Sequence, residues 1–172
     1  MINNKMQQEI NDQINAEFWS GYLYLSMSAW FTQRNLHGFA NWMYVQYQEE
    51  FTHGMKMYRY LLDRGGEVTL KPIAAVDTDW KDCVAIFEQT LKHERKVTSL
   101  INHLMDTAHD IRDYATISFL NWYIDEQVEE EANAEELLEK LKMIKNDSAA
   151  LYALDKELST RVFVDATLTA EE

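Results

Sequence analysis

The sequence contains few residues that interrupt helices. It has one proline and five glycines among 172 residues. Tight turns and left-handed backbone depend largely on these two residue types, so their scarcity argues against a sheet with many short connections. It favours long helices in one domain, which is large enough to bury a sizeable core.

Cysteine and long apolar runs are also scarce. Cys83 is the single cysteine, which rules out an intrachain disulfide and a four-thiolate metal site. The N-terminal segment MINNKMQQEINDQ lacks an apolar signal core, and no run approaches the length of a membrane span. We therefore expect a cytoplasmic protein that is not embedded in a membrane.

Basic residues are outnumbered. The chain has 29 acidic and 16 basic residues, for a formal net charge of -13. Nucleic-acid binding requires the opposite sign, so we expect no nucleic-acid partner. An acidic balance suits the attraction of cations, although solubility alone would also explain it.

Apolar residues recur at helical spacing along most of the chain. The pattern predicts an all-α domain, residues 1–172, with helices at about 5–34, 39–64, 80–107 and 113–143 and a short fifth helix at about 148–160. Gly38 is interpreted as a helix-ending signal, Gly65 as the end of the second helix, and Asp79 as the cap of the third. The tail from Val162 is expected to fray.

The lengths of the connections predict the topology. Short connections make helices one and two antiparallel, and likewise helices three and four. The loop over residues 67–79 is long enough to run the length of helices of roughly 40 Å. The predicted fold is a four-helix bundle with one long crossover between helices two and three.

Each of the four apolar stripes is interrupted near its middle by ionisable or polar residues. In helix order these are Glu17; Glu50 and His53; Glu94; and Gln127 and Glu130. A buried, unpaired carboxylate costs several kcal/mol, roughly, unless it is protonated, paired or metal-bound. The predicted topology places all four interruptions at similar heights, which indicates a shared metal site.

The residue types indicate which metal would bind. Carboxylates with one imidazole suit iron or manganese, and carboxylates can bridge two ions. Glu50 and His53 form a Glu-x-x-His motif, whereas the fourth helix has Gln127 and Glu130 at the corresponding spacing. One metal position would therefore be held by oxygen ligands only, and more weakly.

These residues lie in segments that resemble the non-haem ferritins of bacteria over nearly the whole chain. The segments are NAEFWSGYLYLSMSAW, QEEFTHG, KHE, FLNWYIDEQVEEE and LYALDKELST. The resemblance implies a ferritin-like fold and a homo-oligomeric hollow shell of about 24 subunits. Such a shell would oxidise Fe(II) with dioxygen or hydrogen peroxide and store ferric mineral inside.

The resemblance also implies roles for single residues. Glu17, Glu50 and His53 would hold the first iron, with Glu50 bridging. Glu94 and Glu130 would hold the second iron, with Gln127 beside it. A third, inner iron would use Glu49, Glu126 and Glu129 with Glu130 shared, although a solvated acidic helix face is the alternative for this trio.

Two further positions bear on redox chemistry. Tyr24 matches a family tyrosine near the di-iron centre, where it would supply an electron or a hydrogen bond; simple core packing is the alternative. Phe51 stands where haem-containing relatives have a methionine that ligates haem, so we expect no haem.

Other functions remain as alternatives. An oxygenase on the same bundle would retain its metals and usually has a second histidine, and a rubrerythrin-like peroxidase would bring paired cysteines. A purely structural bundle would have to neutralise four buried carboxylates with one histidine. DNA-protecting miniferritins draw their site from two subunits, whereas here every ligand comes from one chain.

Overall fold

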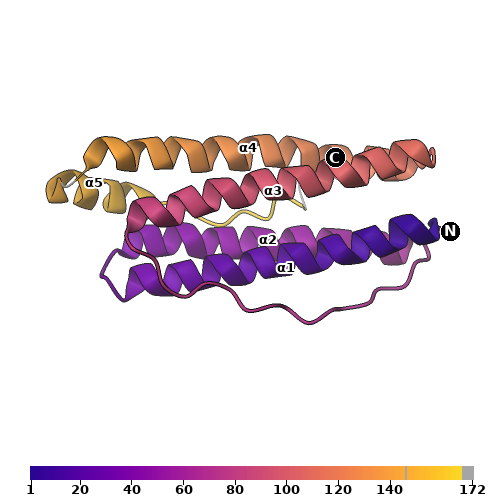
Figure 1. Cartoon of the computed structure of the whole chain (residues 1–172), viewed down its shortest axis with the longest axis horizontal. Helices are drawn as coiled ribbons and strands as arrows, with labels where there is room; N and C mark the ends of the chain where they lie inside the picture. The colour runs from indigo at the N-terminus through magenta and orange to yellow at the C-terminus, as the bar shows by residue number, and fades with distance from the viewer. Residues whose placement is uncertain (146, 168–172) are drawn as a thin grey trace. The chain divides into compact units, whose positions relative to one another are not determined.

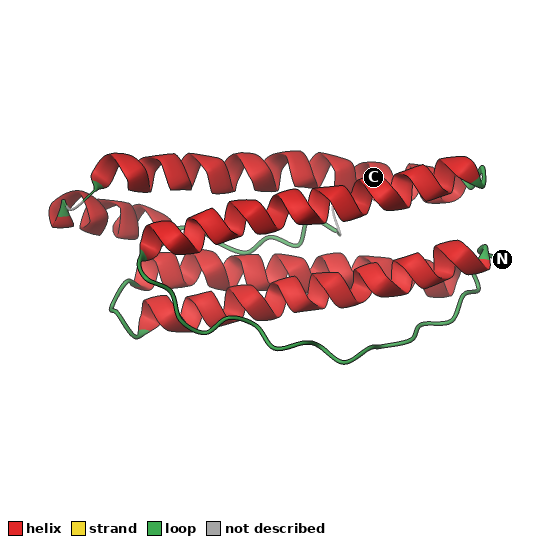
Figure 2. Ribbon diagram, viewed as in Figure 1, coloured by secondary structure: helices red, strands yellow, loops and turns green. Residues whose placement is uncertain are grey.

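The computed structural model describes residues 1–145 and 147–167 and consists of helices joined by loops (Figures 1 and 2). The helices are α1 (Asn4–Thr32), α2 (His37–Asp63), α3 (Cys83–Asp110), α4 (Tyr114–Ile144) and α5 (Ser148–Leu158). The described residues contain no strand, so the all-α prediction is confirmed. Asn146, which we placed in the turn before the fifth helix, lies outside the described residues.

The chain divides into two compact units. One contains Met1–Ile2, Asn11–Asp79 and the described part of Asn146–Glu172. The other contains Asn3–Ile10 and Trp80–Lys145. The helix pair α1 and α2 therefore belongs mainly to the first unit, together with α5, and the pair α3 and α4 belongs to the second.

In the first unit α1 and α2 are antiparallel, as predicted, and lie close together. The Ser28 hydroxyl donates to the Ala40 carbonyl oxygen at 2.8 Å, near the connection between the two helices. Phe31 and Phe39 stack with ring centroids 5.2 Å apart. Further along, a Cβ on Gly21 would lie only 3.3 Å from the carbonyl oxygen of Tyr47, so the small residue permits the close approach.

The connection after α2 is the predicted long crossover (Figure 1). Gly65, in a left-handed conformation with φ of 69°, follows the end of α2, as its position in the sequence predicted. The loop then runs along α1, where polar side chains of α1 form hydrogen bonds with backbone and side-chain atoms of the loop. These are Asn11 to Glu67 and Thr69, Asn15 to Lys71, Ser26 to Asp77, and Trp30 to Asp79.

The second unit begins with a cap that we assigned to the wrong residue. The Asp82 carboxylate accepts a hydrogen bond from the Ala85 amide, and α3 starts at Cys83. The predicted cap, Asp79, instead accepts from the indole of Trp30 at 3.1 Å. A tertiary contact has therefore taken the residue that local sequence favoured.

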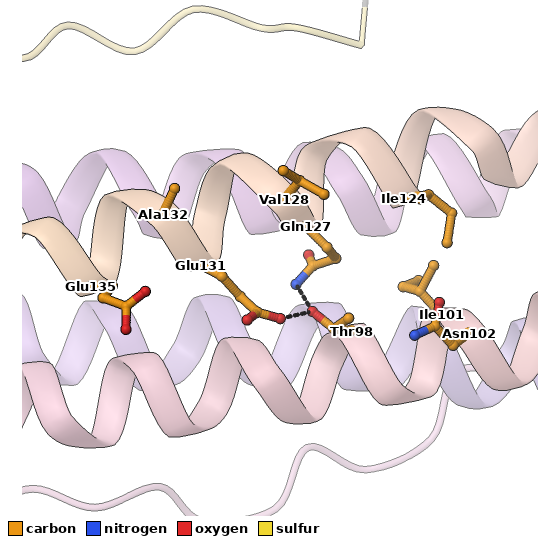
Figure 3. Close-up of a pocket in the computed structure, with 9 residues that line it drawn as sticks. All are labelled: Thr98, Ile101, Asn102, Ile124, Gln127, Val128, Glu131, Ala132 and Glu135. Atoms are coloured by element: carbon orange, nitrogen blue, oxygen red, sulfur yellow. Dashed lines mark hydrogen bonds between the residues drawn. The ribbon is translucent and has the colours of Figure 1, made fainter.

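Helices α3 and α4 form an antiparallel pair. Arg95 on α3 reaches Glu131 at 3.7 Å and Glu135 at 3.4 Å on α4. The pair leaves a groove of about 440 Å³ (Figure 3). Its lining residues are Thr98, Ile101, Asn102, Ile124, Gln127, Val128, Glu131, Ala132 and Glu135.

Gly38 is not the end of a helix, contrary to our interpretation. It lies in the first turn of α2, and the left-handed residue of the preceding connection is Asn35, with φ of 59°. Gly38 instead lies directly against α5, because a Cβ at this position would be 1.6 Å from the Asp155 carbonyl oxygen. The close approach lets the Asp155 carboxylate accept from the amides of Gly38 and Phe39 at 2.7 and 3.1 Å. Asp155 thus caps α2 from a distant part of the chain.

None of the helices in the described residues combines the length and the apolar character needed to cross a membrane.

We expect Asp155→Ala to loosen α5 and the start of α2, because two amides of α2 would lose their acceptor. The loss in unfolding free energy should be about 1 kcal/mol, typical of a helix cap. Urea unfolding would measure it, and hydrogen exchange should become faster at the Gly38 and Phe39 amides. The exposed Glu157 offers a matched control, since Glu157→Ala removes the same charge from α5. Equal exchange in both variants would contradict the capping role.

Candidate metal centre

Helices α1 and α2 bring Glu17, Glu50 and His53 together. One potential ligand atom from each lies within 4.8 Å of the other two. The three residues are 1%, 2% and 4% exposed, respectively. Within the described residues, this is the one set of three acidic, histidine or cysteine side chains close enough to share an ion.

Two glycines let the helices approach at this level. Gly21 lies against α2, and a Cβ there would be 3.5 Å from the Cβ of Glu50. Gly54 lies against the ring of Phe18, which a Cβ would approach to 2.7 Å. A Cβ at Gly54 would therefore collide with the Phe18 ring, and one at Gly21 would pack tightly against α2.

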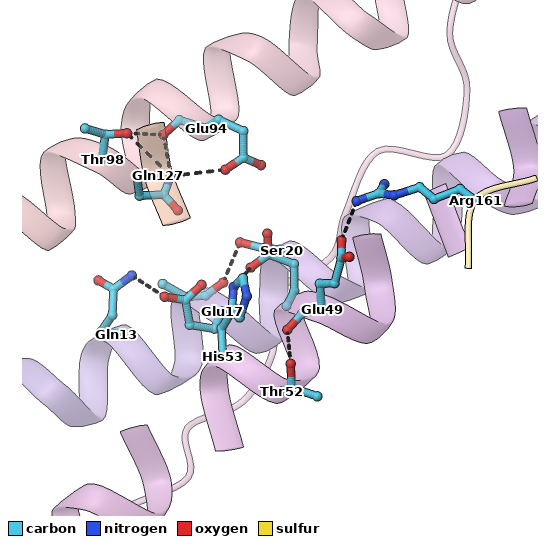
Figure 4. Close-up of polar contacts among 12 residues, drawn as sticks. Gln13, Glu17, Ser20, Glu49, Thr52, His53, Glu94, Thr98, Gln127 and Arg161 are labelled. Carbon is cyan, nitrogen blue, oxygen red and sulfur yellow. Dashed lines mark hydrogen bonds and ion pairs between the residues drawn. The ribbon is translucent and has the colours of Figure 1, made fainter. Parts of the chain in front are cut away.

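The two buried carboxylates are in direct contact. Glu17 shares a hydrogen bond with Glu50. The Glu17 carboxylate also accepts a hydrogen bond from the Gln13 amide at 3.0 Å (Figure 4). Burial raises the pKa of Glu17, while these two hydrogen bonds lower it. Two adjacent carboxylates cannot both ionise in an apolar interior without a compensating positive charge, so this pair suits either a shared proton or a cation.

The imidazole of His53, beside these carboxylates, is in its neutral form. Burial lowers the pKa of His53 from 6.5 to about 4, and the negative charge of Asp165 opposes that shift. His53 is therefore neutral near pH 7, and the neutral imidazole is the form that ligates metal ions. Its Nδ1 lies 3.8 Å from Oε2 of Glu50.

The second unit holds the other predicted ligands as a separate group. Glu94, Gln127 and Glu130 are 1%, 6% and 6% exposed. The Gln127 amide donates to the Glu94 carboxylate at 3.2 Å and to the Glu94 carbonyl oxygen at 3.3 Å (Figure 4). Gln127 of α4 thus contacts Glu94 of α3, and Glu130 is buried on α4.

The remaining candidate residues have different surroundings. Tyr24 is fully buried. Glu126 is half-buried and Glu129 is exposed, both on α4. Glu49 forms an ion pair with Arg161, with its Oε2 atom 2.7 Å from Nη2 of the arginine.

Comparison with known proteins decides the family. A family model described as a ferritin-like domain matches residues 7–144.

The chain belongs to the ferritin family.

Individual ferritins match nearly the whole chain. The bacterial non-haem ferritins of Staphylococcus aureus (strain MRSA252) and Staphylococcus saprophyticus are 40% and 41% identical to it over 163 residues. Each match covers 95% of this chain and 98% of the relative. The structure is also similar to an open pore ferritin from the archaeon Archaeoglobus fulgidus, with a TM-score of 0.93 and 48% identity over 94% of this chain and all of that one. An engineered closed form of that ferritin gives a TM-score of 0.94, again at 48% identity, over 95% of this chain and 100% of that one.

Two polar residues near the candidate ligands, Gln13 and Thr98, were not predicted from the sequence. Gln13 orients Glu17, and the Thr98 hydroxyl lies between Gln127, at 3.4 Å, and Glu131, at 2.5 Å. Each lies four residues from a predicted ligand, Gln13 before Glu17 and Thr98 after Glu94. The signal was therefore helical spacing, but such a spacing is common on any helix.

Burial also acts on His93, which neighbours Glu94 in α3. Burial lowers its pKa to about 4, helped by the positive charge of Lys96. Below about pH 6.5 His93 binds a proton in the unfolded chain but stays neutral in the folded chain, so the unfolding free energy falls as the pH decreases toward 4.

From about pH 7 to pH 5 we expect the apoprotein to lose about 2 kcal/mol more unfolding free energy than its His93→Gln variant. Urea unfolding at both pH values would test this, and equal losses would contradict it.

Proposed function

We propose that this ferritin chain oxidises Fe(II) at an intrasubunit di-iron centre and stores the ferric product as mineral inside a hollow shell of many copies. The observation that supports this most directly is the buried set of Glu17, Glu50 and His53, whose ligand atoms lie within 4.8 Å of one another. Membership of the ferritin family supports the same conclusion.

The complete centre combines both groups of residues. Glu17, Glu50 and His53 hold the first iron, with Glu50 as the bridge. Glu94 and Glu130 hold the second iron beside Gln127, and Tyr24 supplies a hydrogen bond or an electron. This assignment makes residues 1–172 a single functional domain. It is supported by the family match, which extends through both units from residue 7 to residue 144.

The donor set favours oxidation. Four carboxylates are hard anionic ligands, which stabilise Fe(III) over Fe(II) because the higher charge gains more from them. Dioxygen or hydrogen peroxide accepts the electron that each Fe(II) loses. The bound iron also supplies a positive charge to the contacting carboxylates of Glu17 and Glu50.

The second iron position favours release of the product over retention. A glutamine at position 127 donates hydrogen bonds to Glu94 through its amide nitrogen, so that atom does not ligate a metal. With no second histidine, iron there is held by oxygen alone and is free to move on. A third position formed by Glu49, Glu126 and Glu129 with Glu130 receives it on the way to the mineral.

Assembly completes the proposal. About 24 copies in a closed symmetric shell would each contribute a formal charge of -13. A strongly negative interior concentrates Fe(II) and seeds the mineral. The oxygenase alternative would need tightly retained metals, and the structural alternative does not explain why two buried carboxylates contact each other.

Ligand substitutions should slow the first turnover. Glu50→Ala removes the bridge and Glu130→Ala removes a ligand of the second iron. Each should reduce the initial rate of Fe(II) oxidation by at least about tenfold, since even indirect supports of metal ligands are worth this much. Glu129→Ala should change later iron uptake more than the initial rate. Stopped-flow absorbance would measure both phases.

The exposed Glu136 offers the control for these variants. Glu136→Ala removes an α4 carboxylate away from the proposed ligands and should oxidise Fe(II) at the wild-type rate. Normal oxidation by Glu50→Ala would overturn the assignment of the centre.

Storage and shell formation can be tested together. Light scattering after size exclusion should give a particle of about 24 subunits. Fe(II) added in air should be taken up far beyond the few ions that the site residues can bind. A small oligomer that stops at a few irons per chain would instead identify an enzyme that retains its metals.

A further inference from the structure

The carboxylate of Glu49 is already occupied by a positive charge. Nη2 of Arg161 donates to Oε2 of Glu49 at 2.7 Å (Figure 4). The side chains of Glu49 and Arg161 are 20% and 22% exposed, respectively, so water screens this ion pair less than one on an open surface.

Arg161 belongs to the tail that follows α5, and several contacts hold that tail along α2. Asn41 of α2 donates to the carbonyl oxygens of Leu158 and Arg161 at 3.2 and 2.9 Å. The Arg161 guanidinium lies 4.7 Å from the ring centroid of Trp42 and donates to its carbonyl oxygen at 3.3 Å. These contacts position the guanidinium of Arg161 beside the carboxylate of Glu49.

The tail continues toward the proposed iron ligands. Asp165 is close enough to His53 for its charge to oppose the fall in the pKa of that histidine. Thr167 donates to Asp165 through its amide at 3.0 Å. The described tail therefore follows α2 from Asn41 to the level of His53, where we had expected fraying from Val162.

We propose that Arg161 is a built-in competitor for the third iron position. It neutralises Glu49 while iron is absent and must leave that carboxylate before iron binds there. Arg161 thereby lowers the affinity of the third position for iron. This inference rests on the proposed function, because it needs Glu49 to be an iron ligand.

Competition follows from charge and space. The guanidinium donates into the Oε2 lone pairs that an iron ion would use, and two positive charges on one carboxylate oxygen repel strongly at low effective dielectric. Iron at Glu49 must therefore displace a side chain, which lowers its affinity for this position.

The test uses the assembled protein, with Fe(II) added under strict exclusion of oxygen so that binding is measured without oxidation. Calorimetric titration should show two tighter ions per chain and one weaker ion. Arg161→Gln should raise the affinity of the weaker ion by about fivefold, or about 1 kcal/mol, since a factor of ten is about 1.4 kcal/mol. Arg161→Lys, which keeps the charge but loses the planar fork, should lie between the two.

Matched variants separate competition from a general loss of positive charge. Lys156 is exposed on α5 and contacts the Tyr152 ring, so Lys156→Gln removes the same charge away from Glu49. It should leave the weaker ion unchanged. Glu49→Gln should abolish the weaker ion, and adding Arg161→Gln to it should have no further effect.

A structural measurement checks the displacement itself. Fe(II) binding should reduce hydrogen-exchange protection over residues 159–167 in the wild type, and Glu49→Gln should show low protection with or without Fe(II). Unchanged affinity in Arg161→Gln, or a third ion that survives Glu49→Gln, would overturn this inference and leave the two-iron function standing. Failure of the wild type to bind the two tighter ions would overturn the proposed function itself.

Discussion

The contact between two buried carboxylates is the constraint on which the rest of this structure depends. Glu17 and Glu50 share a hydrogen bond at 1% and 2% exposure, an arrangement that needs a proton or a cation. It is possible only because α1 and α2 approach closely, with glycines on either side of the site. His53 completes the set with a neutral imidazole, because burial disfavours a protonated imidazole just as it disfavours an ionised carboxylate.

The second unit treats its buried carboxylate differently. The Glu94 carboxylate accepts a hydrogen bond from the Gln127 amide, which is a neutral donor. The carboxylates of Glu17 and Glu50 thus contact each other, whereas that of Glu94 accepts from a neutral amide. This asymmetry is a physical reason to propose that the two iron positions differ in strength.

Arginine and aspartate place the C-terminal segment with polar contacts. Asp155 caps α2, and Arg161 pairs with Glu49 twelve residues after the beginning of that helix. Charged hydrogen bonds have stricter geometry than apolar packing, so they fix where the segment lies along α2. At the third iron position that we propose, iron at Glu49 would compete with the Arg161 pair that fixes the segment.

Local periodicity determined much of this protein from the sequence alone. The helices, the antiparallel pairs, the long crossover and the Glu50–His53 motif follow from spacings within a few turns of helix, which a sequence displays directly. The Asp79 cap, the role of Gly38 and the occupancy of Glu49 were decided by residues far away in the chain: Trp30, Asp155 and Arg161. Those partners are separated from them by 49 to 117 residues, and only the packing of whole helices brings their atoms within hydrogen-bonding distance.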